Sequence, residues 1–237
     1  MLKIEHLTKV YSNGKKAVDD LSLIVEPGDI YGFIGANGAG KTSTIKSIVG
    51  IHDFDKGEIY ICGHSIRKEP LLCKKKMAFL PDNPDLYKNL TARQFLDFVA
   101  DIYRVSLEKR QAAIEKYSKM FELDTSLDQL ISAYSHGMKQ RLALIAALLH
   151  EPELLIIDEP FVGLDPKGEY YFKQIMRELA SQGHAIFFST HVLEVAEELC
   201  NKVAILQKGR LVANGRTSEV KGASSLEEVF MELQEDD

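Results

Sequence analysis

Apolar and polar residues alternate at the start of the chain, which is the pattern of a half-buried β-strand. The alternation occurs at 2–4 and again at 21–25. Short stretches rich in apolar residues and bounded by turn residues predict further strands. These stretches occupy 30–34, 57–61, 77–80, 154–157 and 185–188. The predicted strands therefore form an early group and a late group.

The middle of the chain changes to a helical spacing of apolar residues. Thr91, Ser106 and Ser135 are good N-cap residues, and apolar side chains such as Phe95 and Ile102 follow at steps typical of one helix face. We therefore predict three consecutive helices between the two groups of strands. A further helix is predicted after a glycine-rich turn, from 41 to 49.

Strands and helices alternate again after this middle part, with a helix from about 167 to 180 between the last two predicted strands. Such alternation predicts a mainly parallel sheet covered by helices, with the active loops at the carboxyl ends of the strands. We predict a single domain over 1–237. Its core consists of 1–82 and 153–237, and a helical subdomain at 83–152 is inserted between these parts.

The end of the chain combines acidic residues with an apolar stripe. Leu226, Val229, Phe230 and Leu233 recur at a helical spacing, while six of the last eleven residues are acidic. This pattern predicts a surface helix that docks through its apolar face and has a frayed tip.

Composition excludes several classes of protein. The 237 residues are 45% hydrophobic, enough to build a core, and the longest apolar run spans eight residues, 142–149, against about 20 for a membrane-spanning helix. The net charge of −6 argues against nucleic acid as the main partner. The chain starts without a signal-peptide pattern and has three cysteines with no CxxC pair, so we expect a reducing cytosolic location. The one compact basic run, 74–76, is interpreted as a solvated face.

A phosphate-binding motif follows the predicted strand at 30–34. Residues 35–42 read Gly-Ala-Asn-Gly-Ala-Gly-Lys-Thr, which matches GxxxxGK[ST] between a strand and a helix. In this arrangement backbone N–H groups wrap the phosphates, Lys41 reaches the β and γ oxygens, and the Thr42 hydroxyl is a ligand for Mg²⁺. The alternative is a glycine turn followed by an incidental lysine, which the strand and helix context disfavours.

Two acids complete the nucleotide hypothesis. The apolar run at 154–157 ends in Asp158 and Glu159. A buried strand can deliver Asp158 to Mg²⁺ and leave Glu159 beside the γ-phosphate, where a carboxylate can accept a proton from attacking water. Acids at a strand end can also simply begin a turn, but that interpretation weakens beside a phosphate-binding loop.

With these motifs the sequence resembles the ATP-binding cassette (ABC) ATPases over essentially its whole length. Five further segments match the family in its order, as an adenine-stacking aromatic, a Q-loop, a signature segment, a D-loop and a switch histidine. These segments are Tyr11, Leu80-Pro81-Asp82-Asn83, Tyr134-Ser135-His136-Gly137-Met138-Lys139-Gln140-Arg141, Gly163-Leu164-Asp165 and Ser189-Thr190-His191.

The resemblance implies an α/β P-loop NTPase fold, in which a RecA-like mainly parallel sheet is joined by an N-terminal antiparallel β region and by the inserted helical subdomain. It also implies ATP and Mg²⁺ as ligands. The implied catalytic residues are Glu159, His191 and Lys41, and the implied metal-binding residues are Thr42, Asp158 and Asp82. Nucleotide contacts are implied for Tyr11, Val18, Asn37, Gly38, Ala39, Gly40, Lys41, Thr42, Ser43, Asp82, Ser135 and Gly137.

The resemblance further implies partners. The signature segment contacts the ATP held by the opposite protomer, so a head-to-tail dimer with a second copy or a paralogous ATPase subunit is expected. A membrane permease subunit is expected to hold the ATPase at the inner face of the cell membrane and to bind the transported substrate. Nucleic acid is not an expected partner.

The sequence departs from the family pattern at two places. Asp82 stands where a Gln is usual, and His136 and Met138 replace two signature residues. An acid in the Q-loop and a YSxGM signature resemble the bacterial exporter branch, which includes drug-resistance and bacteriocin-immunity ATPases. Two alternatives stay open, a soluble non-transport ABC ATPase and a regulatory ATP-binding module with weak catalysis.

Overall fold

The computed structural model describes residues 1–235, and four of its strands form an antiparallel sheet in the order β2-β1-β4-β5. These strands are β1 (Leu2–Val10), β2 (Lys16–Val25), β4 (Lys56–Ile61) and β5 (His64–Ser65). The pairing of β1 with β2 and with β4 is antiparallel throughout. The predicted N-terminal antiparallel region is therefore confirmed.

A second, six-stranded sheet has the order β10-β9-β3-β8-β7-β6. Its strands are β3 (Ile30–Ile34), β6 (Met77–Leu80), β7 (Leu154–Asp158), β8 (Ala185–Thr190), β9 (Lys202–Gln207) and β10 (Arg210–Arg216). Neighbouring strands from β9 to β6 are parallel, and β10 pairs with β9 antiparallel at the edge. The predicted mainly parallel sheet is confirmed.

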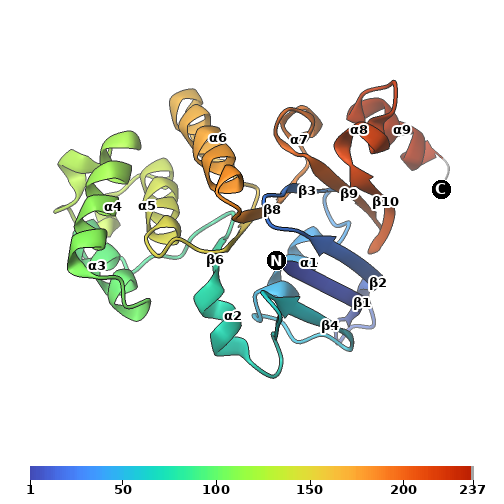
Figure 1. Cartoon of the computed structure of the whole chain (residues 1–237), viewed down its shortest axis with the longest axis horizontal. Coiled ribbons are helices and arrows are strands. Elements are labelled where there is room, and N and C mark those ends of the chain that lie inside the picture. Colours follow the sequence, from blue (N-terminus) through green and yellow to red (C-terminus); the bar gives the residue numbers. More distant parts are fainter. Residues whose placement is uncertain (236–237) are drawn as a thin grey trace.

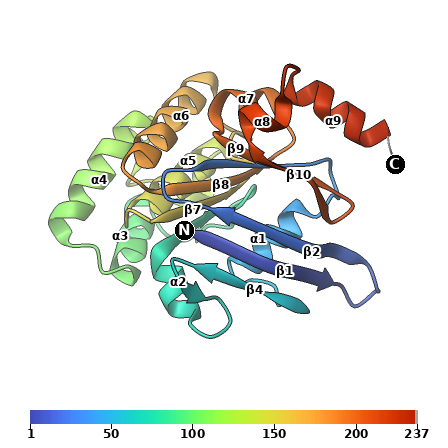
Figure 2. The same cartoon turned by 45° about the vertical axis from the view of Figure 1, so that its right-hand side comes forward.

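Both faces of the central strands β3, β7 and β8 are buried. Successive side chains point to opposite faces of a strand, so each of these strands contributes to two cores. In β8, Ala185 and Phe187 join the core shared with the antiparallel sheet and α1. Ile186 and Phe188 join the core shared with the other helices. The molecule thus has three layers, with the parallel sheet between the antiparallel sheet and the helices (Figures 1 and 2).

The helices begin where the N-cap residues predict them. The Thr91 hydroxyl accepts from the backbone N–H of Gln94 in a full capping box, and Ser106 and Ser135 cap the next two long helices. The helices are α1 (Lys41–Ile48), α2 (Pro70–Lys76), α3 (Ala92–Ile102), α4 (Leu107–Met120), α5 (His136–Leu148), α6 (Pro166–Ser181), α7 (Leu193–Leu199), α8 (Thr217–Lys221) and α9 (Leu226–Glu235), with 3-10 turns at Asp124–Ser126 and Ile131–Ala133.

Between β6 and β7 the chain forms α3, α4 and α5, which lie together at one end of the molecule (Figure 1). At the other end, α9 docks through the predicted stripe, since Leu226 is buried and Val229, Phe230 and Leu233 pack against the same core. The predicted frayed tip falls on 236–237, outside the described residues. No helix in the described part of the chain is long and apolar enough to span a bilayer.

Candidate nucleotide-binding site

The order of the parallel strands brings four distant sequence segments to one edge of the sheet. β3, β8, β7 and β6 are consecutive neighbours that run in the same direction, so their carboxyl ends meet. These ends lead into the glycine-rich loop at 35–42, His191, the Asp158-Glu159 pair and Asp82. The carboxyl edge of a parallel sheet is where ligands of this fold class bind.

The glycine-rich loop ends in a close backbone contact. Gly40 is the N-cap of α1 with φ of 114°, and a Cβ at this position would lie 2.3 Å from the Ala17 carbonyl oxygen. Only glycine fits both the left-handed conformation and the available space. This contact fixes the N-terminus of α1 toward the cleft, and the free N–H groups of that first turn suit an anion.

Lys41, the first residue of α1, folds back over the loop. Its Nζ donates to the carbonyl oxygens of Gly35 (2.6 Å) and Ala36 (3.4 Å), and its side chain is buried. Burial lowers the pKa of Lys41, while the Glu159 and Asp158 carboxylates act in the opposite direction. The ammonium group is thereby held at the rim of the loop that would surround the phosphates.

Asp158 accepts hydrogen bonds from two hydroxyl groups. Thr42 Oγ1 donates to its Oδ2 at 3.0 Å, and Ser189 Oγ donates to its Oδ1. The carboxylate itself is buried at the end of β7. The hydroxyl and carboxylate oxygens of Thr42 and Asp158 are the hard ligands that Mg²⁺ prefers, and Mg²⁺ commonly takes few protein ligands beside nucleotide and water. The residues present therefore fit a magnesium ion bound together with a nucleotide.

Glu159 stands between a cation and an imidazole. Its Oε1 accepts from His191 Nδ1 at 3.0 Å and lies 3.8 Å from Lys41 Nζ. The residue has φ of 52°, a left-handed conformation that is uncommon away from glycine and that directs the chain out of β7. Its backbone N–H donates to the Ser189 carbonyl oxygen at 3.2 Å, which secures this turn. The carboxylate is therefore held at the mouth of the cleft, where it can accept a proton.

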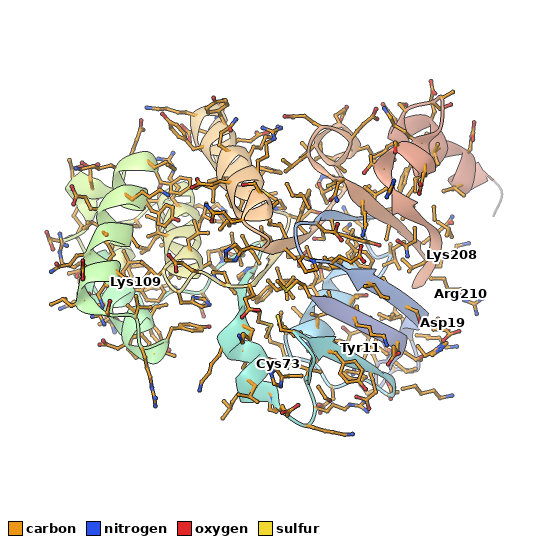
Figure 3. All side chains as sticks on the ribbon, in the orientation of Figure 1. Tyr11, Asp19, Cys73, Lys109, Lys208 and Arg210 are labelled. Atoms are coloured by element: carbon orange, nitrogen blue, oxygen red, sulfur yellow. The ribbon has the colours of Figure 1, made fainter. Side chains whose placement is uncertain are left out.

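The glycine-rich loop, Thr42 and the two acids line one cleft with a volume of about 250 Å³, and His191 reaches it through its bond to Glu159. Tyr11 bounds it on the side of the antiparallel sheet, where its hydroxyl hydrogen-bonds Ser43 Oγ at 2.9 Å (Figure 3). The exposed Asp82 borders the cleft beyond β6. The lining residues are Tyr11, Lys15, Ala17, Ala36, Asn37, Gly38, Gly40, Lys41, Thr42, Ser43, Asp82, Asp158 and Glu159.

Comparison with known proteins identifies the family. Residues 18–162 match the model of the ABC transporter family. The chain is 34% identical to the ABC-type transporter ATP-binding protein EcsA of Bacillus subtilis, across 100% of this chain and 98% of that protein. The chain belongs to the ABC transporter ATPases. It is also 39% identical over 213 residues to the bacitracin transport ATP-binding protein BcrA of Bacillus licheniformis, covering 90% of this chain and 68% of that protein.

Solved structures agree with this assignment. An ATP-binding subunit of an ABC transporter superposes with a TM-score of 0.95 at 33% identity, over 99% of each chain. A dimeric ATP-binding cassette in a post-hydrolysis state, bound to ADP and Pi, shares the fold with a TM-score of 0.82 at 24% identity. This protein is therefore an ATP-binding, ATP-hydrolysing subunit of the ABC transporter family.

Some of the sequence-predicted site residues of this ABC ATPase lie outside the cleft. The Val18 side chain is fully buried in the core beneath β2, so its neighbour Ala17 lines the cleft instead. The Val18 side chain thus packs in the core, and its contact with a nucleotide stays a prediction. Ala39 faces an adjoining cavity of about 370 Å³ between the loop and α9.

The signature segment is also outside the cleft. Ser135 is exposed and accepts from the backbone N–H of Met138 at 3.2 Å, which caps α5. Gly137 lies against the D-loop, where an added Cβ would sit 2.9 Å from the Gly163 carbonyl oxygen. The N-terminus of α5 in this ABC ATPase therefore lies beside the D-loop and is not part of the lining of the protomer's own cleft.

One ion pair was missed by sequence reasoning. Arg141 Nη2 donates to Asp165 Oδ1 at 2.9 Å, and Arg141 Nη1 donates to the Phe121 carbonyl oxygen at 3.2 Å. Asp165 also caps α6 through the backbone N–H of Gly168. The pair thus ties the signature helix to the D-loop of the ABC ATPase. Both residues stood in motifs identified from the sequence, but nothing in their 24-residue separation indicated contact.

Proposed function

We propose that this subunit hydrolyses ATP in the cleft with Glu159 as general base. The observation that supports this role most directly is the position of the Glu159 carboxylate, which is hydrogen-bonded to His191 and close to Lys41. Lys41 binds the β and γ oxygens, His191 donates a hydrogen bond to the γ-phosphate, and Glu159 accepts the proton of the attacking water. Asn37, Gly38 and the neighbouring backbone N–H groups wrap the phosphates.

Thr42 and Asp158 would hold Mg²⁺, with Asp82 as a further oxygen beside it. The ion supplies charge neutralisation at the β- and γ-phosphates. Tyr11 stacks on the adenine ring, since it lines the cleft and its hydroxyl is bonded to Ser43, next to the phosphate loop. Stacking accepts any base face, so we expect poor discrimination between ATP and GTP.

The active form is a head-to-tail dimer with a second copy or a paralogous ATPase subunit. Support comes from the signature segment, because Ser135 and Gly137 do not line the cleft of their own protomer. The exposed N-terminus of α5, a helix of 13 residues, offers N–H groups and a partial positive charge to an anion. Each complete site would thus combine the phosphate loop of one protomer with the signature of the other.

The subunit drives an exporter by moving its helical part, 83–152, against a membrane permease. Exposed apolar side chains supply a contact surface on this part, namely those of Tyr87, Phe98 and Ile102. Relatives of this chain include a bacitracin transport ATP-binding protein and a Nod factor export ATP-binding protein. The permease would keep the chain at the inner face of the cell membrane, and no nucleic acid takes part.

A mixed-dimer experiment tests the shared site. Ser135→Arg chains and Lys41→Ala chains are each expected to be inactive but should recover some hydrolysis when mixed, because one intact Lys41 then meets one intact Ser135. Hydrolysis by the unaltered chain should rise cooperatively with ATP concentration. Ser132→Arg is the matched control, since Ser132 is also exposed but caps no helix. Full activity of dilute, monomeric Ser135→Arg protein with a linear ATP dependence would refute the dimer.

A further inference from the structure

Positive charge gathers in one short segment of this acidic chain. Five of the ten residues from 67 to 76 are basic and one is acidic, whereas the whole chain carries a net charge of −6. The segment contains α2 and the turn before it. None of its residues lines the nucleotide cleft, so the proposed hydrolysis does not account for it.

α2 is attached to the protein by one face. Cys73 is its buried residue, and the Cys73 thiol donates to the His64 carbonyl oxygen at 3.3 Å (Figure 3). Two leucines point outward instead, with Leu71 73% exposed and Leu72 41% exposed. Residues three and four apart share a helix face, so Leu71 and Leu72 both neighbour Lys75. The outward face of α2 is thus apolar and basic together.

The basic residues of the segment divide into two groups. Arg67 and Lys76 are used within the protein, since the Arg67 guanidinium packs 3.7 Å from the centre of the Phe54 ring and Lys76 pairs with Glu153. Lys68, Lys74 and Lys75 form a second group, for which the described part of the chain provides no carboxylate partner. All three are exposed. This second group is therefore available to an external anion.

The chain runs from α2 through β6 to the proposed permease contact. α2 packs on β6, and β6 leads directly to Asp82 and the exposed Tyr87. α2 and α3 lie on the same lower side of the molecule in both views (Figures 1 and 2). An ATPase docked on a permease through α3 would therefore hold α2 close to the membrane in which the permease lies.

We propose that the outward face of α2 binds the anionic headgroups of the membrane, with Lys68, Lys74 and Lys75 facing phosphates and Leu71 and Leu72 inserted shallowly among the lipids. A basic and leucine-bearing helix surface is typical of interfacial membrane binding. Cytoplasmic permease loops themselves carry an excess of Lys and Arg, so they complement this cluster less well than an anionic leaflet does. The inference rests on the proposed membrane partner for its place in the cell.

Vesicle sedimentation with the full chain tests the lipid contact without any permease. The chain should bind vesicles of equal parts phosphatidylglycerol and phosphatidylcholine, should not bind pure phosphatidylcholine, and should dissociate as salt increases. Lys74→Gln with Lys75→Gln should lower the partition coefficient about twenty-five-fold, at about fivefold per charge. The control, Lys116→Gln with Lys119→Gln, makes the same charge change on α4, where both lysines already pair with glutamates, and should leave binding unchanged.

A second pair of variants tests the leucines. Leu71→Ser with Leu72→Ser should weaken vesicle binding even at low salt, whereas Leu107→Ser with Leu130→Ser, which alters two other exposed leucines, should not. Absence of binding to the anionic vesicles, or an equal loss in the α4 control, would overturn the proposal. Loss of stimulation by a permease without vesicle binding would assign the cluster to a protein partner instead. Vesicle binding by a chain that hydrolyses no ATP would refute the proposed catalysis and leave this inference standing.

Discussion

Glu159→Gln separates ATP binding from ATP hydrolysis. The amide keeps the size of the side chain and its place between His191 and Lys41 but cannot accept a proton. Loss of a general base slows proton transfer about 10²- to 10⁴-fold, which corresponds to about 3 to 5 kcal/mol in the barrier. ATP affinity should remain intact, because the groups that wrap the phosphates are unchanged and one negative charge near them is removed.

Single-turnover hydrolysis and equilibrium binding of a fluorescent ATP analogue measure the two effects separately. Glu151→Gln is the matched control, because Glu151 also has a left-handed backbone, with φ of 50°, and pairs at the surface with Lys109 (Figure 3). That variant should turn over normally. Turnover like that of the unaltered chain in Glu159→Gln, with unchanged ATP affinity, would refute Glu159 as the base.

Tyr11→Ala should weaken ATP binding by about 1 to 3 kcal/mol. Tyr11→Phe loses only the bond to Ser43 and should retain most of the affinity. An ATP titration that gives Tyr11→Ala the same affinity as the unaltered chain would exclude stacking. Asp82→Gln removes a charge near the phosphates, so ATP affinity or turnover should hold or rise, and a severe loss would give the acid a role of its own. Burial lowers the pKa of His150, so its protonation favours unfolding. The free energy of unfolding should therefore fall as pH drops below about 6.5, and it should fall less steeply in His150→Gln. Denaturant titrations that give the unaltered chain and His150→Gln the same pH profile would contradict this.

Local signals in the sequence determined the elements that depend on neighbouring residues. The caps Thr91, Ser106 and Ser135 start helices as predicted, because a side-chain oxygen satisfies N–H groups only two or three residues away. The strand at 30–34 was predicted at its observed bounds, since both faces are buried and the whole run is apolar. α2 was missed because its leucines remain exposed and its single buried residue gives no periodic pattern.

Contacts between distant segments were decided by the tertiary structure. The order of β3, β8, β7 and β6 places His191 against Glu159 across 32 residues, and no local pattern encodes strand order. The same is true of the Arg141–Asp165 pair. The sequence by itself determined that a phosphate loop, two acids and a histidine follow strands. Only the packing of those strands decided that the loop and the two acids share one cleft and that the histidine bonds Glu159. The same packing turns the Val18 side chain into the core, because burial depends on which neighbours cover each face.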